Sequence, residues 1–359
     1  MSKHVVIVGG GIVGCMTAME LVDRGHRVTI VERNQIASQT SGESSWAGGG
    51  IVFPLLPWMY SEPVNALTQF GAEKYRQICE RLECETNLPT GFHQSGFLIL
   101  PNFDSQLALS WCEQYQVEVE SVKASQFEGI SSQDENALWL PKVCQIRPPY
   151  LMQALRLWLE QHQVTLLENT ELSPLQELGE LKEWKTLDGR TISADQFIVT
   201  SGAWSFQLLK DVASQLSIKP MRGQILLYQP KNNLNQIVYK DGFYMIPRPD
   251  GYLLAGSTLE DVGFDSSTTE QVRVELAAKA EAIMPALKGM PIIKHWSGLR
   301  PGTPENLPTI SAHPTIKNLY LNTGHFRYGL TMAPASAKLV ADLIDVRQPF
   351  MSVEAFALS

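Results

Sequence analysis

The chain has 359 residues, which is enough for two domains of average size or one large two-layer fold. Its 44% hydrophobic and 18% charged residues are typical of a globular protein and exclude the disordered, collagen-like and coiled-coil classes. The formal net charge of -8 argues against a nucleic-acid partner, because most of the surface would repel a polyanion. Five cysteines without a CxxC pair indicate reduced thiols, so we expect a cytoplasmic protein.

No segment has the pattern of an export signal or a membrane helix. The apolar stretch Val5–Val8 is too short for a signal-peptide core. The longest uncharged apolar stretch, 46–60, is interrupted by three glycines and two prolines, which prevents a membrane-spanning helix. We therefore expect no integral membrane segment, and we expect residues 46–60 to line a site inside the protein.

Hydrophobic patterns predict pieces of one α/β layer at the start, middle and end of the chain. Val5–Val8 is predicted as a buried strand, 12–24 as a helix ended by Gly25, and 27–31 as the next strand, which together form a βαβ unit. Further elements of this layer are helices over 149–162 and from about 334 to 344, and strands over 164–167, 196–200 and 318–322.

Short strand candidates of a different character lie between these pieces. They are interrupted by Pro, Asp and Gly, which is typical of an antiparallel sheet. These candidates are 96–100, 224–228, 244–246 and 252–255. The fold class we predict is α/β, with a doubly wound, mostly parallel Rossmann-like sheet and an interleaved α+β domain built on an antiparallel sheet.

A dinucleotide fingerprint follows the first strand. Gly9, Gly11 and Gly14 match G-x-G-x-x-G at the head of the first helix, where free N–H groups and the helix dipole attract phosphates. Glu32 closes the second strand, and its carboxylate favours FAD or NAD over NADP because it would repel a 2'-phosphate. The Ser- and Gly-rich stretch 38–50 fits either a second phosphate-binding loop or a plain connection.

Five motifs make the family resemblance specific: HVVIVGGGIVG with VERN, SSWAGGGIV, YMIPR at 244–248, WSGLRPGT at 296–303, and GHFRYGLTMAPASAKLVADLI at 324–344. In this order, and over nearly the whole chain, they resemble the D-amino-acid oxidase (DAO) family of FAD-dependent oxidoreductases. The similarity is closest to glycine oxidases of the thiamine-biosynthesis type.

The resemblance implies noncovalent FAD and two interleaved domains. The FAD-binding domain would comprise 1–86, 143–219 and 297–359, and the substrate-binding domain 87–142 and 220–296. A cysteinyl-flavin bond of the kind that monomeric sarcosine oxidases form has no candidate, because no cysteine follows Cys144.

The resemblance also implies a set of cofactor contacts. They are Gly9, Gly11, Ile12, Val13, Gly14, Glu32, Arg33, Ser41, Ser44, Ser45, Ala47, Gly48, Gly49, Leu172, Ser201, Gly202, Trp204, Gly298, Arg300, His325, Arg327, Tyr328, Gly329, Leu330 and Thr331. Backbone N–H groups of Gly329–Thr331, ahead of the last helix, would stabilise negative charge on reduced flavin.

Three residues are the candidates for catalysis. Arg300 has the fork needed to clamp a substrate carboxylate, with a surface or domain-bridging ion pair as the alternative. Tyr244 matches the family's pocket tyrosine, which adds a second bond to that carboxylate, although a core tyrosine would have the same pattern. Arg327 resembles an arginine beside flavin and substrate, or it forms a structural salt bridge. No general base is required if the amine binds unprotonated.

The sequence departs from the family pattern at Leu259, Gly242 and Tyr328, each of which we expect to line or border the pocket. Gly242 removes bulk and Tyr328 adds it. The departures leave the preferred substrate open among glycine, sarcosine and small D-amino acids.

The expected activity is FAD-dependent oxidative deamination of glycine or another small amino acid or amine, with oxygen as acceptor and hydrogen peroxide as product. One alternative is a D-amino-acid dehydrogenase that passes electrons to a quinone or cytochrome. A second is a tRNA carboxymethylaminomethyl-uridine oxidase, which the acidic charge balance disfavours. A third is a nucleotide-binding protein without turnover. Seven histidines without ligand spacing predict no metal, and a homo-oligomer is compatible with the resemblance.

Overall fold

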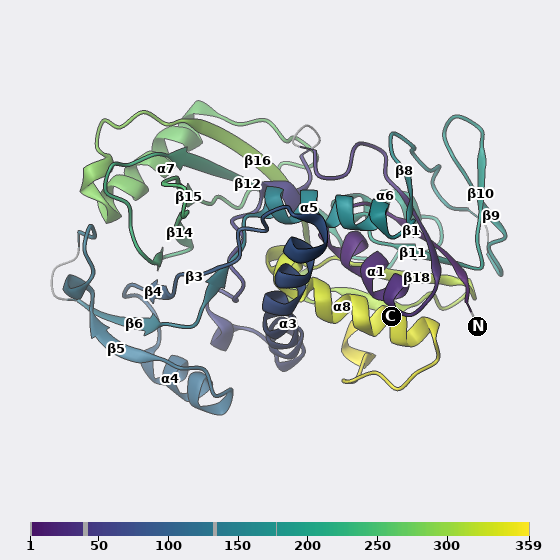
Figure 1. The fold of residues 1–359 in the computed structure, drawn as a ribbon, viewed down its shortest axis with the longest axis horizontal. Coiled ribbons are helices and arrows are strands. Elements are labelled where there is room, and N and C mark those ends of the chain that lie inside the picture. The colour runs from purple at the N-terminus through teal and green to yellow at the C-terminus, as the bar shows by residue number, and fades with distance from the viewer. Residues whose placement is uncertain (1, 39–41, 132–134, 177, 359) are drawn as a thin grey trace.

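The computed structural model describes residues 2–38, 42–131, 135–176 and 178–358, which form two neighbouring sheets (Figure 1). One sheet has six strands and the other has eight. The chain passes from the six-stranded to the eight-stranded sheet and back twice, so neither sheet is built from one continuous stretch of sequence.

The six-stranded sheet is parallel except for its edge strand β17. It places β1 at the centre, where both faces are covered, and this explains the uninterrupted apolar run of that strand. The strands in spatial order are β17 (Thr309–Ala312), β18 (Leu319–Thr323), β11 (Gln196–Val199), β1 (His4–Val8), β2 (Arg27–Val31) and β8 (Thr165–Leu167).

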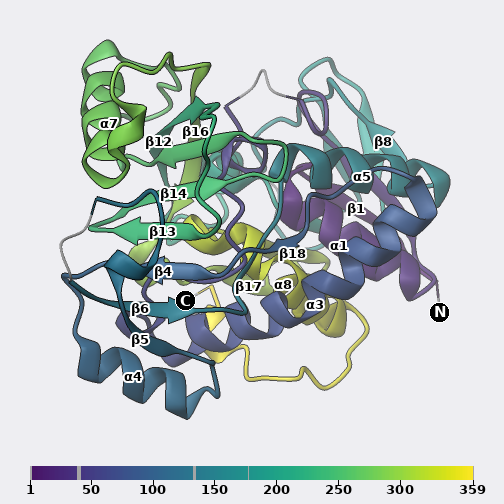
Figure 2. The same cartoon turned by 60° about the vertical axis from the view of Figure 1, so that its left-hand side comes forward.

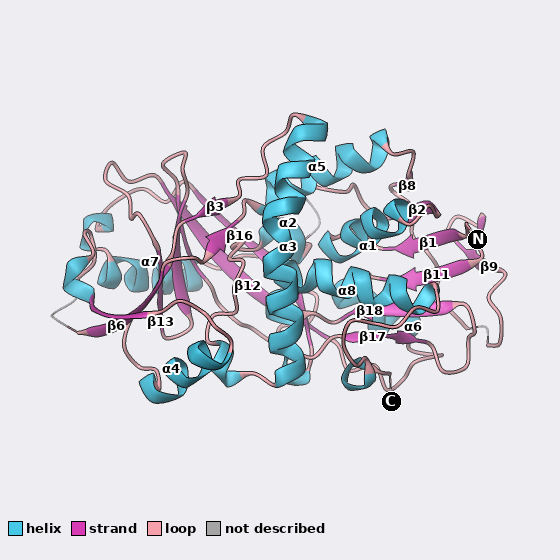
Figure 3. Cartoon of the chain, turned by 60° about the horizontal axis from the view of Figure 1, so that its bottom comes forward, coloured by secondary structure: helices cyan, strands magenta, loops and turns pink. Residues whose placement is uncertain are grey.

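Four helices lie on one side of this sheet, where the first and the last of them contact its strands and the other two pack against these two (Figure 3). They are α1 (Ile12–Asp23), α3 (Glu62–Thr86), α5 (Pro148–Gln161) and α8 (Gly329–Ile344). The other face carries a second apolar core that contains Trp184 and Leu209, contributed by the hairpin β9 (Glu183–Lys185) and β10 (Thr191–Ser193) and by α6 (Ser205–Leu209). Neither these helices nor any other in the described ranges is long and apolar enough to cross a membrane.

The eight-stranded sheet is antiparallel except for the parallel pair β4 and β13. Helix α7 (Glu270–Ile283) packs on one face and α4 (Ser105–Gln114) on the other, as Figure 2 shows. The strands in spatial order are β16 (Lys294–Gly302), β12 (Lys219–Tyr228), β15 (Leu253–Gly256), β14 (Phe243–Pro247), β13 (Ile237–Lys240), β4 (Phe97–Ile99), β6 (Asn136–Leu140) and β5 (Glu120–Lys123).

The remaining elements are short. They are α2 (Ser44–Ala47), the pair β3 (His93–Gln94) and β7 (Cys144–Gln145), and 3-10 helices over Pro57–Met59, Ala124–Gln126, Gly202–Trp204, Pro285–Leu287, Pro304–Asn306, Phe326–Tyr328 and Glu354–Phe356.

The predicted fold class is confirmed, and the first βαβ unit is present with β1 and β2 in parallel register. The division into two interleaved domains stays a prediction, and its boundary at 296/297 falls inside the continuous strand β16. The sequence analysis did not identify α3, although Ser61, Pro63 and the left-handed Asn87 are typical residues for the ends of a helix.

The predicted start of the last helix at Pro334 is wrong, because α8 begins at Gly329 and contains Pro334. Proline has no N–H, so it leaves the carbonyl of Leu330 without its helical partner. The hydroxyl of Tyr75 on α3 donates to that carbonyl at 2.5 Å. The helix therefore continues through the proline because α3 supplies the missing hydrogen bond.

We expect Tyr75→Phe to lower the free energy of unfolding by about 1–3 kcal/mol, the cost of leaving a buried carbonyl without a partner. Urea denaturation of the flavin-free protein measures this difference. Tyr115→Phe is the matched control, because no hydrogen bond of the Tyr115 hydroxyl is present among the described residues. Equal losses of unfolding free energy in both variants would contradict the stabilising role of the Tyr75 hydrogen bond.

Candidate active site

A cavity of about 480 Å³ lies between the two sheets. It starts at the carboxyl ends of β1, β2 and β11 and extends to β14 and β16 of the eight-stranded sheet. Residues 48–51, 53 and 55, within the apolar stretch that we expected to line a site, form part of its wall. Carboxyl ends of parallel strands are the usual binding edge of open α/β sheets.

The glycine fingerprint forms one end of the cavity, where Gly9, Gly11, Ile12 and Val13 line the wall. The hydroxyl of Ser45 accepts a hydrogen bond from the N–H of Ile12 at 2.9 Å. The first N–H groups of α1 have no partners within the helix, and this end is therefore suited to phosphate oxygens.

Gly14 does not line the cavity but allows close packing behind it. A Cβ atom at Gly14 would lie 2.0 Å from the carbonyl oxygen of Gly9 and 2.8 Å from the Thr200 hydroxyl. Ala47 and Gly298 also pack together outside the cavity wall, since a Cβ at Gly298 would lie 2.6 Å from that of Ala47. Ser41 lies outside the described residues.

Glu32 lines the cavity at the end of β2 and is fixed by backbone groups. One carboxylate oxygen accepts from the N–H of Gly10 at 2.8 Å, and the other accepts from the N–H of Asn34 at 2.9 Å. The guanidinium of Arg33 lies 3.8 Å from the ring centre of Trp204. These contacts leave acceptor sites of Glu32 for ribose hydroxyls and place a cation and an aromatic ring at the same end.

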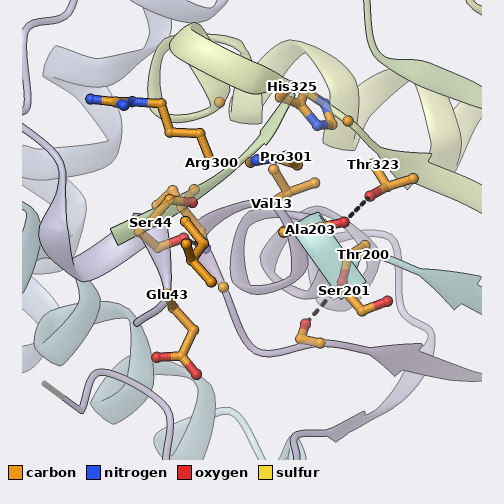
Figure 4. Close-up of a pocket in the computed structure, with 18 of the residues that line it drawn as sticks. Val13, Glu43, Ser44, Thr200, Ser201, Ala203, Arg300, Pro301, Thr323 and His325 are labelled. Carbon is orange, nitrogen blue, oxygen red and sulfur yellow. Dashed lines mark hydrogen bonds between the residues drawn. The ribbon is translucent and has the colours of Figure 1, made fainter. Parts of the chain in front are cut away.

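The other expected wall residues come from several elements. Ser44, Ser45, Gly48 and Gly49 belong to α2 and the loop after it, and Leu172, Ser201, Gly202 and Trp204 follow β8 and β11. Figure 4 shows Ser44, Ser201 and His325 on separate segments around the cavity. Thr200, Glu43 and Asn322 also line it and were not expected.

The start of α8 forms a further part of the wall, through Gly329, Leu330 and Thr331. Before it, His325 is buried, its Nε2 has no partner among the described residues, and burial lowers its pKa to about 3. His325 is therefore neutral at pH 7. Tyr328 is also buried and donates a hydrogen bond to the hydroxyl of Tyr60 at 2.6 Å.

Arg300 extends from β16 at the opposite end of the cavity (Figure 4). Its Nη2 donates to the hydroxyl of Ser257 at 2.8 Å, and its Nη1 donates to the carbonyl of Thr258 at 3.1 Å. Each of these nitrogens keeps a second N–H. Burial lowers the pKa of Arg300, and the neighbouring Tyr244 offsets only part of this shift.

Tyr244 and Arg327 line the same end of the cavity. Tyr244 is buried, while Arg327 is exposed, with its guanidinium 5.3 Å from the ring centre of Phe326. Within the described ranges, neither arginine has a carboxylate within 4.0 Å, so the ion-pair alternatives do not hold there. The nearby Glu260 is hydrogen-bonded to Arg222 at 2.7 Å. Positive charge therefore dominates this end.

The departures from the family pattern have different positions. Gly242 and Tyr328 line the cavity, and a Cβ at Gly242 would have no heavy atom within 4 Å. The expectation that Leu259 borders the pocket is wrong, because its side chain is 42% exposed and does not line the cavity. It follows β15 on a segment that turns away towards solvent.

Sequence reasoning missed Gly223 and Ser257, which position Arg300. A Cβ at Gly223 would lie 2.1 Å from Nη1 of Arg300, so the guanidinium lies directly on this glycine. The predicted strand 224–228 began one residue after Gly223, whereas β12 includes it. A glycine inside a strand indicates a close approach of another group, and this signal was lost with the boundary.

We expect Gly223→Ala to raise KM for the substrate roughly 10- to 100-fold, because the added methyl group must displace the guanidinium by an ångström or more. Steady-state kinetics measure this change. A double-mutant cycle with Arg300→Lys supplies the control. In the Arg300→Lys background, where the guanidinium is absent, Gly223→Ala should change KM at most threefold. Equal effects in both backgrounds would show that Gly223 acts on the fold alone.

Comparison with known proteins gives the family. The sequence profile of the FAD dependent oxidoreductase (DAO) family matches residues 4–343. The chain belongs to this family. A glycine oxidase of Pseudomonas aeruginosa is 38% identical over 99% of both chains, and one of Pseudomonas putida is 36% identical over 99% of this chain and 98% of its own.

The structure of glycine oxidase from Geobacillus kaustophilus superposes with a TM-score of 0.89 at 25% identity, covering 100% of this chain and 98% of that one. A bifunctional ThiO/ThiG protein of Trichormus variabilis is 29% identical over 96% of this chain and 53% of its own length.

The residues of this DAO-family chain fit FAD. The glycine loop excludes side chains where phosphates must approach the backbone, Glu32 offers acceptors for ribose, and the cavity continues from there to Arg300. The buried Nε2 of His325 offers one more polar atom to a ligand. The described residues contain no group of three side chains placed to hold a metal ion.

Proposed function

We propose that the protein oxidises glycine, or another small amino acid or amine, to the imine, which water converts to the 2-oxo acid and ammonia. The observation that carries the proposal is the fixed fork of Arg300, held by Ser257 and Thr258 with N–H groups remaining for a carboxylate. The glycine oxidases of Pseudomonas, at 38% and 36% identity, support this substrate class.

The proposed roles follow from the positions of the side chains. Arg300 and Tyr244 hold the substrate carboxylate, so the Cα–H bond is directed along the cavity towards the cofactor ring. When bound, FAD supplies the acceptor for the hydride and its two electrons. The walls of Ile51, Phe53 and Leu55 exclude water from the reacting carbon. His325, with its pKa of about 3, is a poor proton acceptor, which agrees with an amine that binds unprotonated.

The cofactor contacts of the sequence analysis are proposed for the residues that line the cavity, and Gly14, Ala47 and Gly298 are proposed to act through packing. Noncovalent attachment of FAD is supported by the cavity wall, where none of the described residues is a cysteine. Oxygen as the acceptor, a cytoplasmic location and a homo-oligomeric state belong to the same proposal.

The visible spectrum of the purified protein is the first test. Anaerobic glycine, sarcosine, D-alanine and D-proline are added in turn, and air is then readmitted. The proposal expects a yellow flavin spectrum that bleaches with glycine and returns within seconds in air, with one hydrogen peroxide formed per flavin.

Two other outcomes would replace the proposal. A spectrum that bleaches with D-amino acids and stays bleached in air, but recovers with a quinone, would establish the dehydrogenase. A colourless protein that binds no flavin when FAD is added would exclude the flavin-dependent reaction altogether.

A further inference from the structure

Arg248 is a buried cation directly after β14, outside the residues assigned above. Its side chain is 5% exposed, and its Nε has no partner among the described residues. Its other nitrogens donate to neutral oxygens only: Nη1 to the Gln145 side chain at 2.6 Å and the Ile146 carbonyl at 3.0 Å, and Nη2 to the Gly49 carbonyl at 2.6 Å.

No carboxylate lies within 4.0 Å of this guanidinium in the described part of the chain. The nearest acidic group that affects it, Asp250, forms an ion pair with Arg147. Burial lowers the pKa of Arg248 to about 9, so the group remains charged at neutral pH. The buried guanidinium of Arg248 is therefore positively charged and is hydrogen-bonded only to neutral groups. Its electric field is weakly screened because little water surrounds it.

One peptide group connects Arg248 to the wall of the cavity. Gly49 and Gly50 line the cavity, and the peptide between them is trans. In a trans peptide the C=O and N–H bonds point in opposite directions. Because the Gly49 carbonyl points at Arg248, the N–H of Gly50 points away from Arg248, and it has no partner among the described residues.

The orientation of this peptide is fixed on both sides. Gly50 has a φ of +81°, and a Cβ there would lie 2.0 Å from the carbonyl oxygen of Ile146. The N–H of Ile146 donates to the Gly50 carbonyl at 2.8 Å. At Gly49, a Cβ would lie 2.8 Å from Ile246 and 3.1 Å from Tyr244.

The position of the Gly49–Gly50 peptide indicates which part of the bound cofactor it would contact. Phosphates at the glycine loop and a carboxylate at Arg300 leave the stretch between them, along Gly48–Ile51, for the cofactor ring. We propose that Arg248 is a positioning residue that polarises the Gly49–Gly50 peptide, so that the Gly50 N–H stabilises the negative charge that the bound flavin gains on reduction. This inference rests on the proposed function only in requiring bound FAD.

A pair of variants at Gln145 separates the charge of Arg248 from its contacts. Gln145 is buried, accepts from Arg248, and donates to Ser95 at 3.0 Å and to the Pro247 carbonyl at 2.8 Å. Gln145→Glu keeps an acceptor for Arg248 and adds a compensating negative charge. Gln145→Met loses the same two donated hydrogen bonds and also the acceptor for Arg248, but it adds no charge, so it controls for the loss of contacts.

The measurement is the two-electron midpoint potential of the bound flavin, obtained by dithionite reduction against reference dyes without substrate. We expect Gln145→Glu to shift the reduction equilibrium about tenfold towards oxidised flavin, which corresponds to about 30 mV. Gln145→Met should stay within threefold of the unmodified protein. Arg248→Met, which removes the charge, should shift the equilibrium in the same direction as Gln145→Glu.

The proposal is overturned if the reduction equilibrium of the flavin in Gln145→Glu stays within twofold of that in the unmodified protein. It is also overturned if the Glu and Met variants shift this equilibrium equally towards oxidised flavin. Circular dichroism and thermal melting establish that each variant is folded, and Gln145→Glu decides the question if Arg248→Met does not fold. Because no substrate is used, failure of glycine to reduce the flavin refutes the proposed function and leaves this test valid.

Discussion

Arg300→Met is expected to lower kcat/KM for glycine by about 10²- to 10³-fold, the largest kinetic effect among the substitutions considered. A buried charge that hydrogen-bonds an opposite charge contributes about 2–5 kcal/mol when one partner is truncated. Ser257 and Thr258 hold the guanidinium, so little conformational entropy remains to be lost when the carboxylate binds. The kcat/KM of Arg300→Lys should lie between those of Arg300→Met and the unmodified protein, because lysine keeps the charge and loses the two-pronged guanidinium.

Stopped-flow reduction of the flavin by glycine measures this effect directly. Arg190→Met is the control, since Arg190 is 57% exposed at the turn between β9 and β10 and does not line the cavity. The flavin spectrum of Arg300→Met should match that of the unmodified protein. A loss of less than fivefold would assign the substrate carboxylate to another cation, and Arg327 would be the next to test.

Gly14→Ala is expected to weaken FAD binding by at least about 100-fold, so that the protein purifies colourless. The added Cβ would lie 2.0 Å from the Gly9 carbonyl oxygen, and backbone cannot move aside as a side chain can. Helix α1 must then shift away from the strand, and the N–H groups that attract phosphates shift with it. Equilibrium titration of the apoprotein with FAD, followed by flavin fluorescence, gives the dissociation constant.

Gly10→Ala is the control for this substitution, one position inside the same motif. There the new Cβ would lie 2.5 Å from Cγ1 and 2.9 Å from Cδ1 of the Ile36 side chain, and it would meet no backbone atom. Its effect on the dissociation constant should be at least tenfold smaller. If both variants bind FAD equally well, the fingerprint does not form the phosphate site.

The sequence predicted the parallel layer well because its information is local. An apolar run ending in glycines, a helix and a second apolar run identify β1, α1 and β2 without knowledge of the rest of the chain. The start of α8 could not be predicted in this way. Pro334 normally argues for a helix boundary, and the hydroxyl of Tyr75, some 250 residues earlier, supplies a hydrogen bond that stabilises a helix through it.

The site shows the same division between local and distant information. Arg300 was a candidate because its chemistry and motif stand in the sequence, and the cavity brings it together with Tyr244 and Arg327. Gly223 and Ser257 were missed because their importance arises from strand pairing. Gly223 lies under Arg300 only because β12 and β16 are neighbours, a fact of tertiary structure that one sequence does not contain.

The path of the chain between the two sheets limits how the protein can move. Four connections cross from one sheet to the other, and β16 also contacts the 3-10 helices Gly202–Trp204 and Phe326–Tyr328 beside the six-stranded sheet. A hinge would have to bend all of these segments at once. We therefore expect small ligands to enter and leave by displacement of side chains and short loops, while the two layers keep a fixed angle throughout turnover.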